Sequence, residues 1–163
     1  MIILGIDPGY DRLGIAILEK KNKETLLHSE CFITSSKDSF YTRLFQIGKR
    51  INEIIKEYNP DILAIESLFI TKNQKTAMRV SEARGVIMYE AIKNNIKVLE
   101  YTPLQIKMAV TGYGKSDKAQ IIKMIPLLVK LPIKKAQDDE YDSIAVALTC
   151  LAYNTNQKNL SVN

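Results

Sequence analysis

The first eighteen residues, MIILGIDPGYDRLGIAIL, place a single carboxylate within an otherwise apolar stretch. Met1–Asp7 is rich in aliphatic and β-branched residues, which predicts a buried strand ending at Asp7. Pro8–Asp11 has the composition of a turn, and Leu13–Leu18 is a second apolar run, so the stretch predicts a β-hairpin. The chain is therefore expected to carry a carboxylate at the end of a buried strand, where a turn begins.

The rest of the chain alternates between strand and helix patterns. Apolar residues recur at helical spacing from residue 39 to residue 58, where Asp38 or Ser39 can cap the start and Asn59-Pro60 ends the helix. This order predicts an α/β fold, with a five-stranded mixed sheet and helices on both faces. The further strands are expected at Thr25–Thr34, Asp61–Glu66 and Lys97–Tyr101, and the helices at Ser39–Tyr58, Gln74–Asn94, Pro103–Val110, Asp117–Val129 and Asp138–Tyr153.

Length and composition limit the classes of protein that fit. The 163 residues, 46% hydrophobic and 25% charged, suit one domain, expected over residues 1–153 and followed by a polar, disordered tail at residues 154–163. No apolar run reaches the roughly 20 residues of a membrane helix, and MIILGI is too short for a signal peptide. Two cysteines and a single histidine, His28, exclude a disulfide framework and a multi-histidine metal site. We expect a cytoplasmic protein.

Two further acidic segments can meet Asp7. Glu66 is the last residue of DILAIE, and if that strand lies parallel and adjacent to the first, both carboxylates face one crevice at the carboxyl ends of the strands. The last expected helix opens QDDEYDSIAVAL, where Asp139 and Asp142 are three residues apart and share one face.

Four carboxylates held close together repel one another unless a cation lies between them. Two Mg²⁺ ions would balance the four charges, because Mg²⁺ prefers oxygen ligands and completes its shell with water and phosphate. Two such ions roughly 3.5–4 Å apart assist phosphodiester hydrolysis by activating water and stabilising the leaving oxygen. The pattern thus indicates metal-dependent phosphoryl chemistry.

Each acid also has a structural explanation. An aspartate at the end of a strand often forms a turn, and acids in the first turn of a helix often interact with its dipole. Spacing alone supports the two interpretations about equally. We assign Asp11, Asp138 and Glu140 to the structural class, as caps or surface residues.

The net charge of +5 and the pI of about 9.1 favour a polyanionic partner. Lys115 and Lys118 flank a break that contains Gly112 and Gly114, so they are placed to reach a phosphate, with the backbone able to approach closely. A helix stop beside a solvated helix face is the alternative explanation.

Taken together, four motifs are highly specific. They are GIDPGYDRLGIAI at residues 5–17, AIESLFITKNQKTAMRVSEARGV at 64–86, VTGYGKSDKAQI at 110–121 and DDEYDSIAVAL at 138–148. From Ile3 to about Tyr153 the chain resembles the RuvC family of bacterial Holliday-junction resolvases. The resemblance implies a ribonuclease H-like fold, a homodimer, and Mg²⁺-dependent paired nicking of two opposed strands of a four-way DNA junction during recombination and repair.

The resemblance also implies roles for individual residues. It assigns two Mg²⁺ ions per active site, for which Mn²⁺ can substitute, and basic residues near the scissile phosphate. It also matches one aromatic residue to the aromatic that family members place against DNA bases at the junction. Several polar residues match positions that contact DNA or the second subunit. By analogy it suggests RuvA and RuvB as partners. The ligands would be Asp7, Glu66, Asp139 and Asp142, the basic catalytic residues Lys107 and Lys118, the aromatic Phe69, and the further contacts Lys72, Asn73, Arg79 and Arg84. Lys115 is added to the DNA-contact candidates by its position beside the glycine-containing break.

One departure concerns the segment between the last two acids. A small or acidic residue is expected there, whereas this chain has Glu140-Tyr141. Tyr141 can either pack on the sheet or lie near DNA. The neighbouring Asp138 also leaves open a shift of the first ligand by one position.

The helix expected at Gln74–Asn94 is apolar over more than one face. One face should pack on the sheet, and the other can pair with a two-fold mate, which would present two sites to the two strands of a junction.

Three other functions fit parts of the pattern. An ATPase of the actin and sugar-kinase superfamily shares the strand–Asp–Gly hairpin, but it needs two domains, and 163 residues supply one. A non-catalytic DNA-binding module would have no need for all four acids. A related nuclease could act on structured RNA.

Overall fold

The computed structural model describes residues 1–68, 74–131 and 137–160 of the chain. A central sheet contains β1 (Ile2–Asp7), β2 (Arg12–Lys20), β3 (Glu24–Ile33), β4 (Ile62–Glu66) and β5 (Lys97–Tyr101). Its strand order is β3-β2-β1-β4-β5. Strands β1, β2 and β3 form an antiparallel meander, whereas β4 is parallel to β1 and β5 is parallel to β4. The predicted five-stranded mixed sheet, with β1 and β4 as parallel neighbours, is confirmed.

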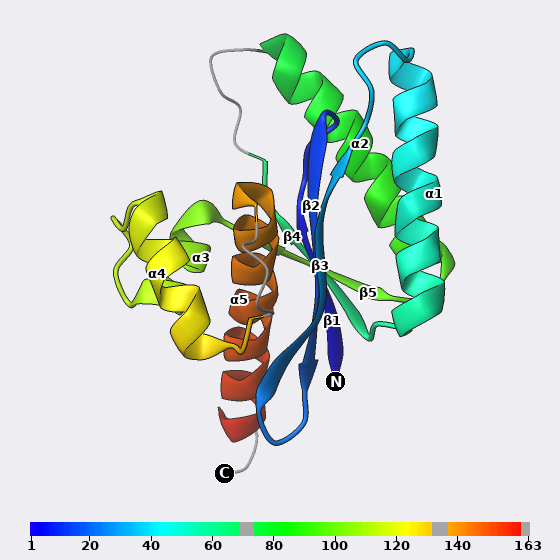
Figure 1. The fold of residues 1–163 in the computed structure, drawn as a ribbon. Helices are drawn as coiled ribbons and strands as arrows, with labels where there is room; N and C mark the ends of the chain where they lie inside the picture. The colour runs from blue at the N-terminus through cyan, green and yellow to red at the C-terminus, as the bar shows by residue number, and fades with distance from the viewer. Residues whose placement is uncertain (69–73, 132–136, 161–163) are drawn as a thin grey trace.

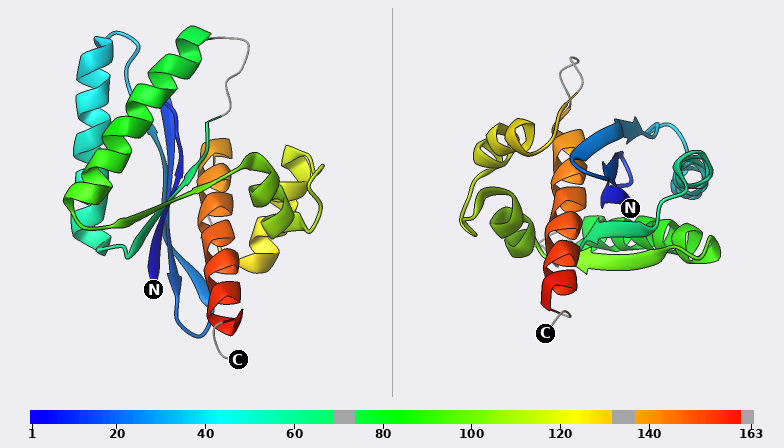
Figure 2. Two further views of the ribbon diagram at one scale, coloured as in Figure 1. Left: turned by 180° about the vertical axis from the view of Figure 1, so that it is seen from behind. Right: turned by 90° about the horizontal axis from the view of Figure 1, so that it is seen from below.

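Helices cover both faces of the sheet, as predicted (Figures 1 and 2). Each face has its own apolar cluster, one with side chains of α1 and α2 and the other with side chains of α3, α4 and α5. The helices are α1 (Phe40–Tyr58), α2 (Gln74–Lys93), α3 (Pro103–Thr111), α4 (Lys118–Leu128) and α5 (Asp138–Leu160).

Local sequence signals explain where the helices begin and end. Ser39 caps α1 by accepting a hydrogen bond from the Thr42 amide, and Asn59 ends that helix in the left-handed conformation. Capping boxes start α3 at Thr102 and α4 at Asp117. Gly112 ends α3 with a φ of 72°, a backbone conformation that favours glycine.

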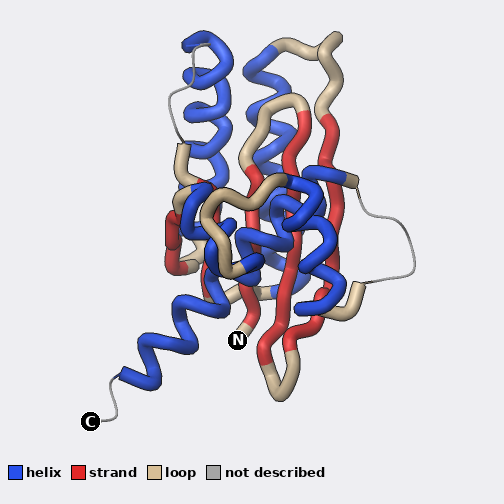
Figure 3. The backbone as a smooth tube through the Cα atoms, turned by 90° about the vertical axis from the view of Figure 1, so that its left-hand side faces the viewer, coloured by secondary structure: helices blue, strands red, loops and turns tan. Residues whose placement is uncertain are grey.

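Helix α5 is longer than the pattern predicts. It continues past Tyr153 to Leu160, and its end extends beyond the body of the molecule (Figure 3). The segment after Tyr153 contains neither glycine nor proline, the two residues that most strongly interrupt a helix. The division into a domain at residues 1–153 and a disordered tail at 154–163 stays a prediction. No helix in the described ranges combines the length and apolarity needed to cross a membrane.

Helix α5 lies directly against the backbone of the first hairpin. A Cβ at Gly5 of β1 would stand 2.4 Å from the Ser143 carbonyl oxygen and 2.7 Å from the Ala147 Cβ. A Cβ at Gly14 of β2 would stand 2.1 Å from the Asp139 carbonyl oxygen. Both contacts are shorter than atoms tolerate, so glycine is required for this close packing.

Replacing Gly5 with alanine is expected to push α5 away from β1. Overpacking of this kind costs roughly 1–3 kcal/mol of unfolding free energy, which urea denaturation would measure. Gly85→Ala is the matched control, because Gly85 is exposed in α2 and an added methyl group would have no neighbour within 4 Å. That control should gain up to roughly 1 kcal/mol from helix propensity. Equal effects at the two glycines would contradict the packing argument.

Candidate active site

Two of the four predicted carboxylates lie at the ends of neighbouring parallel strands. Asp7 is the last residue of β1 and Glu66 the last residue of β4. The parallel register pairs Ile6 with Ile65, so Asp7 and Glu66 follow the last paired residues on the same edge of the sheet. The carboxyl ends of these strands form the edge at which α/β proteins place their sites.

The other two carboxylates come from the start of α5. Asp139 and Asp142 lie in its first turns, and Gly14 is the partner of Asp7 across the hairpin. A Cβ on Gly14 would meet both the Asp139 carbonyl and, at 3.1 Å, the Asp7 Cβ. Because Gly14 has no Cβ, the start of α5 can lie close to Asp7.

The electrostatics of Asp7 indicate that the four acids share one environment. Burial, and then the charges of Asp142, Glu66 and Asp139, raise the pKa of Asp7 to about 7, against a small opposing effect of Lys118. Burial and the charge of Asp142 also raise the pKa of Glu66. The sheet edge thus holds more negative charge than its own cations neutralise.

A pocket of about 280 Å³ opens beside these acids. Glu66 and Asp142 line it together with Lys107 of α3 and Lys118 of α4, so the two lysines matched by the family resemblance face the same space as two of the acids. Apolar side chains form the remaining wall, which comprises Pro103, Ile106, Ile121 and Ala145.

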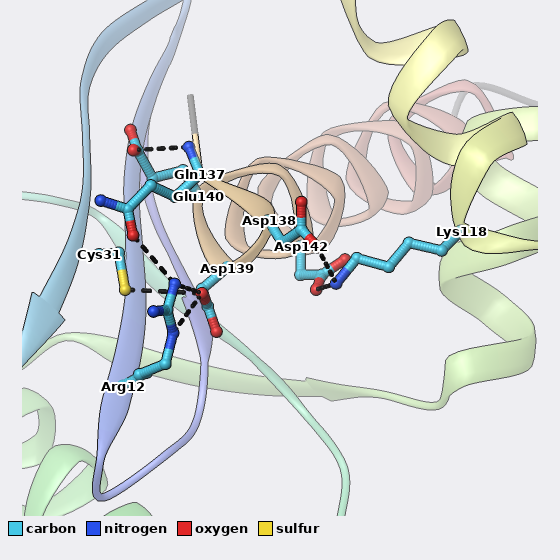
Figure 4. A network of polar contacts seen from close by, with 8 residues as sticks. All are labelled: Arg12, Cys31, Lys118, Gln137, Asp138, Asp139, Glu140 and Asp142. Atoms are coloured by element: carbon cyan, nitrogen blue, oxygen red, sulfur yellow. Dashed lines mark hydrogen bonds and ion pairs between the residues drawn. The ribbon is translucent and has the colours of Figure 1, made fainter. Parts of the chain in front are cut away.

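Cations of the chain pair with the acids of α5. The Lys118 Nζ donates to the Asp142 Oδ2 at 2.9 Å and lies 3.6 Å from the Asp138 Oδ2 (Figure 4). The Arg12 guanidinium donates to Asp139 on the other side of the helix. Among the described residues, no Lys, Arg or His forms an ion pair with the carboxylate of Asp7 or Glu66.

The donor set suits a divalent cation. Mg²⁺ prefers carboxylate oxygens, and the two acids without an ion-pair partner among the described residues, Asp7 and Glu66, are the two whose pKa values are raised, chiefly by partial burial. Within the described ranges, no three His, Cys, Asp and Glu side chains are already arranged to hold one metal ion. Lys118 engages Asp142, and Arg12 engages the Oδ2 of Asp139, so binding of an ion by Asp142 would require Lys118 to adjust.

The two neighbouring candidates for the first ligand of α5, Asp138 and Asp139, differ in exposure. The Asp138 side chain is 71% exposed, whereas that of Asp139 is 21% exposed and points toward the first hairpin. This placement favours Asp139 as the ligand. Glu140 accepts hydrogen bonds from the Ser29 hydroxyl at 2.7 Å and the Gln137 amide at 3.0 Å, in keeping with a structural role. Tyr141 packs against the apolar cluster beneath α5.

Arg84 is placed differently from a surface DNA contact. It is 6% exposed, and its guanidinium donates to the Glu66 carbonyl oxygen and, at 2.5 Å, to the Glu100 carboxylate. Because it joins β4 and β5 directly behind Glu66, the geometry favours a supporting role. The position of Arg84 in the sequence of α2 did not predict this supporting role. Whether an arginine on a helix is buried depends on which strands the helix packs against.

Two of the remaining residues predicted to contact DNA are described by the structure, and neither lines the pocket beside the acids. Arg79 lies over the rings of Phe40 and Tyr10, at 5.0 and 5.7 Å from their centroids, and Lys115 is exposed between α3 and α4. Phe69, Lys72 and Asn73 lie outside the described residues. Sequence reasoning missed Arg12, whose only signal is an arginine close after the Asp-Pro-Gly turn.

Comparison with known proteins identifies the family. The family model for crossover junction endodeoxyribonuclease RuvC matches residues 3–150. The chain belongs to the RuvC family. RuvC of Petrotoga mobilis is 47% identical over 148 residues, covering 90% of this chain and 91% of that protein. RuvC of Thermosipho melanesiensis is 46% identical over 156 residues, covering 95% and 99%. RuvC proteins are endodeoxyribonucleases, which hydrolyse phosphodiester bonds.

Solved structures agree with this membership. Thermus thermophilus RuvC in complex with Holliday junction substrate superposes with a TM-score of 0.91 at 29% identity, covering 96% of each chain. The yeast mitochondrial Holliday junction resolvase Ydc2 shares the fold, with a TM-score of 0.73 at 14% identity over 96% of this chain and 80% of that one. The predicted resolvase-type, ribonuclease H-like fold is confirmed.

The raised pKa of Asp7 predicts a pH-dependent stability. Without divalent cations the folded state binds the Asp7 proton more tightly than the unfolded state, whose pKa is near 3.8. The contribution of Asp7 to the free energy of unfolding therefore falls as pH rises from about 4 to about 7, because Asp7 loses its proton at a lower pH in the unfolded state than in the folded state. Above pH 7, ionised Asp7 destabilises the folded state by its full amount. In EDTA, Asp7→Asn should be more stable than the wild type at pH 8, by an amount that shrinks toward pH 4. Urea unfolding at both pH values measures this, and a constant difference would contradict it.

Proposed function

We propose that this chain is a structure-selective endonuclease that resolves Holliday junctions by Mg²⁺-dependent, paired nicking of two opposed DNA strands. The observation that carries the proposal is the gathering of Asp7, Glu66 and the first acids of α5 at one sheet edge, beside a pocket shared with Lys107 and Lys118. Relatives at 46–47% identity, named crossover junction endodeoxyribonuclease RuvC, support it. So does the likeness to a RuvC chain solved with Holliday junction substrate.

The four acids are the proposed ligands of two Mg²⁺ ions, for which Mn²⁺ can substitute. Bound there, the ions would activate a water for in-line attack and stabilise the leaving oxygen. Asp7 and Glu66 are carried by strands, which hold a ligand more rigidly than a loop does. Asp139 and Asp142 are carried by α5, whose position is set by the glycine contacts.

Lys107 and Lys118 are the proposed phosphate contacts. Both line the pocket beside Glu66 and Asp142, so a phosphate lying against the acids would be within the field of two ammonium groups. Lys118 would then exchange its ion pair with Asp142 for a contact with the phosphate. This exchange retains its positive charge at the site while freeing Asp142 to act as a ligand.

Further DNA contacts are proposed for five residues in addition to the acids and the two lysines. Phe69 would stack on a junction base, a contact worth roughly 1–3 kcal/mol in single-strand recognition. Lys115, Lys72, Asn73 and Arg79 would contact the DNA backbone. By family analogy, RuvA and RuvB are the proposed protein partners, and the cytoplasm is the proposed compartment.

The face formed by α1 and α2 is the proposed site of contact with a second copy of the chain. Phe45 and Tyr89 border a groove of about 580 Å³ between these helices and are 70% and 63% exposed. Ile92 of α2 is 62% exposed on the same helix. A two-fold dimer would bury these side chains and match the two-fold symmetry of a junction.

Cleavage of an end-labelled four-way junction tests the proposal. Asp7→Asn should lose cleavage by several orders of magnitude while retaining junction binding, because it removes one ligand charge but no positive charge. The wild type should nick only the junction, in symmetric pairs, and lose this activity in EDTA. A linear duplex is the substrate control. Cleavage by Asp7→Asn at the wild-type rate would show that the ligand assignment is wrong.

The same assay separates the alternatives. Junction binding without nicks, across junctions of varied core sequence, would indicate a non-catalytic module. Preference for a four-way RNA junction would indicate an RNA-directed nuclease. The match to the RuvC family over residues 3–150 already favours a nuclease over an ATPase.

The dimer surface has its own test. Tyr89→Glu places a charge within the proposed interface and should shift the protein to monomers in sedimentation analysis, with loss of paired nicking. Leu127→Glu is the matched control, since Leu127 is 78% exposed on α4, on the opposite side of the sheet. A wild type that is monomeric when bound to a junction would contradict the dimer.

A further inference from the structure

Hydrogen bonds to Asp139 converge on one of its two carboxylate oxygens. The Arg12 Nε and Nη2 atoms donate to the Oδ2 at 2.8 and 2.5 Å, and the Cys31 Sγ donates to the same atom at 3.6 Å (Figure 4). Neither these two residues nor any other side chain in the described part of the chain donates to the Asp139 Oδ1. One oxygen is therefore fully engaged, and the other is left available.

The guanidinium that makes these contacts is itself anchored. Its Nη2 also donates to the Gln137 Oε1 at 2.9 Å, immediately before α5 begins. Arg12 is the first residue of β2, and its backbone is paired with Ile33 of β3. The arginine thus links the sheet to the start of α5 through a side chain that is 46% exposed.

We propose that Arg12 is a positioning residue that holds Asp139 with its Oδ1 free to act as a single-oxygen metal ligand. This inference rests on the assignment of Asp139 as a ligand in the proposed function. A carboxylate free to rotate loses side-chain entropy when it binds an ion, and hydrogen bonds from a second layer of residues reduce that cost. Arg12 supplies such bonds through two nitrogens to one oxygen, a geometry that a lysine cannot reproduce.

The opposite role, in which Arg12 competes with the ion, makes a different prediction. A competing cation lowers metal affinity, so its removal would tighten metal binding. A positioning residue raises affinity, so its removal would weaken it. The sign of the change in metal affinity therefore distinguishes the two roles without reference to cleavage.

The experiment measures Mn²⁺ binding to the full-length protein without DNA, by electron paramagnetic resonance of the free ion. Arg12→Ala should bind Mn²⁺ roughly 10–100-fold more weakly than the wild type, the range typical of second-layer partners of metal ligands. Arg12→Lys should also bind weakly, because it keeps the charge but loses the paired donors. Arg50→Ala is the matched control. Arg50 makes a similar two-nitrogen contact with Glu30, at 2.6 and 3.0 Å, between α1 and β3.

Junction cleavage at saturating Mn²⁺ adds a second measurement. Arg12→Ala should show a lower kcat and an unchanged KM for the junction, while Arg50→Ala should match the wild type. Thermal unfolding of each variant shows that the protein measured is folded. A loss confined to folded Arg12 variants supports positioning over a general structural effect.

Three results would overturn the proposal. Equal or tighter Mn²⁺ binding by Arg12→Ala would make Arg12 a competitor of the ion. Wild-type behaviour of Arg12→Lys in both measurements would reduce its role to charge alone. Absence of Mn²⁺ binding by the wild type would overturn the metal assignment itself, which distinguishes that failure from a failure of the Arg12 proposal.

Discussion

Helix α5 can lie on the backbone of β1 and β2 only because Gly5 and Gly14 have no side chains. This contact sets the distance between the acids of the helix and Asp7 of the strand. A methyl group at either position would separate the two layers, and with them the two halves of the carboxylate cluster. The rest of the site depends on this spacing, since α3 and α4 pack against α5 and bring Lys107 and Lys118 to the pocket.

The cluster that results is electrostatically unfavourable without a cation. Asp7 is partly buried close to three other acids, and its pKa is raised to about 7. The protein's own cations balance only the outer acids, through Arg12 at Asp139 and Lys118 at Asp142. Repulsion between clustered acids lowers the stability of the folded state. Destabilising clusters of this kind are typical of functional sites, where a bound ligand removes the repulsion. The clustering of the four acids therefore explains both the destabilising charge of Asp7 and the proposed binding of metal ions.

Much of the fold follows from local patterns. Alternating apolar runs and helical spacing predicted every strand and helix described, and Ser39 was among the expected caps. The end of α5 was misplaced because polar composition alone does not end a helix. Asp7, Glu66, Asp139 and Asp142 were recognisable because each ends or begins an apolar element. Lys107 was assigned only by family resemblance, since nothing in its spacing separates it from a surface lysine.

Arg12, Arg84 and the two packing glycines carried no such local signal. Their roles depend on partners distant in the chain, with Arg12 meeting Asp139 across 127 positions and Gly5 meeting Ser143. The sequence by itself determined the elements, their order and the acids at their ends, because hydrophobic periodicity acts over a few neighbouring residues. Only the tertiary structure decided which side chains orient those acids, because hydrogen bonds and close contacts form between elements that folding brings together.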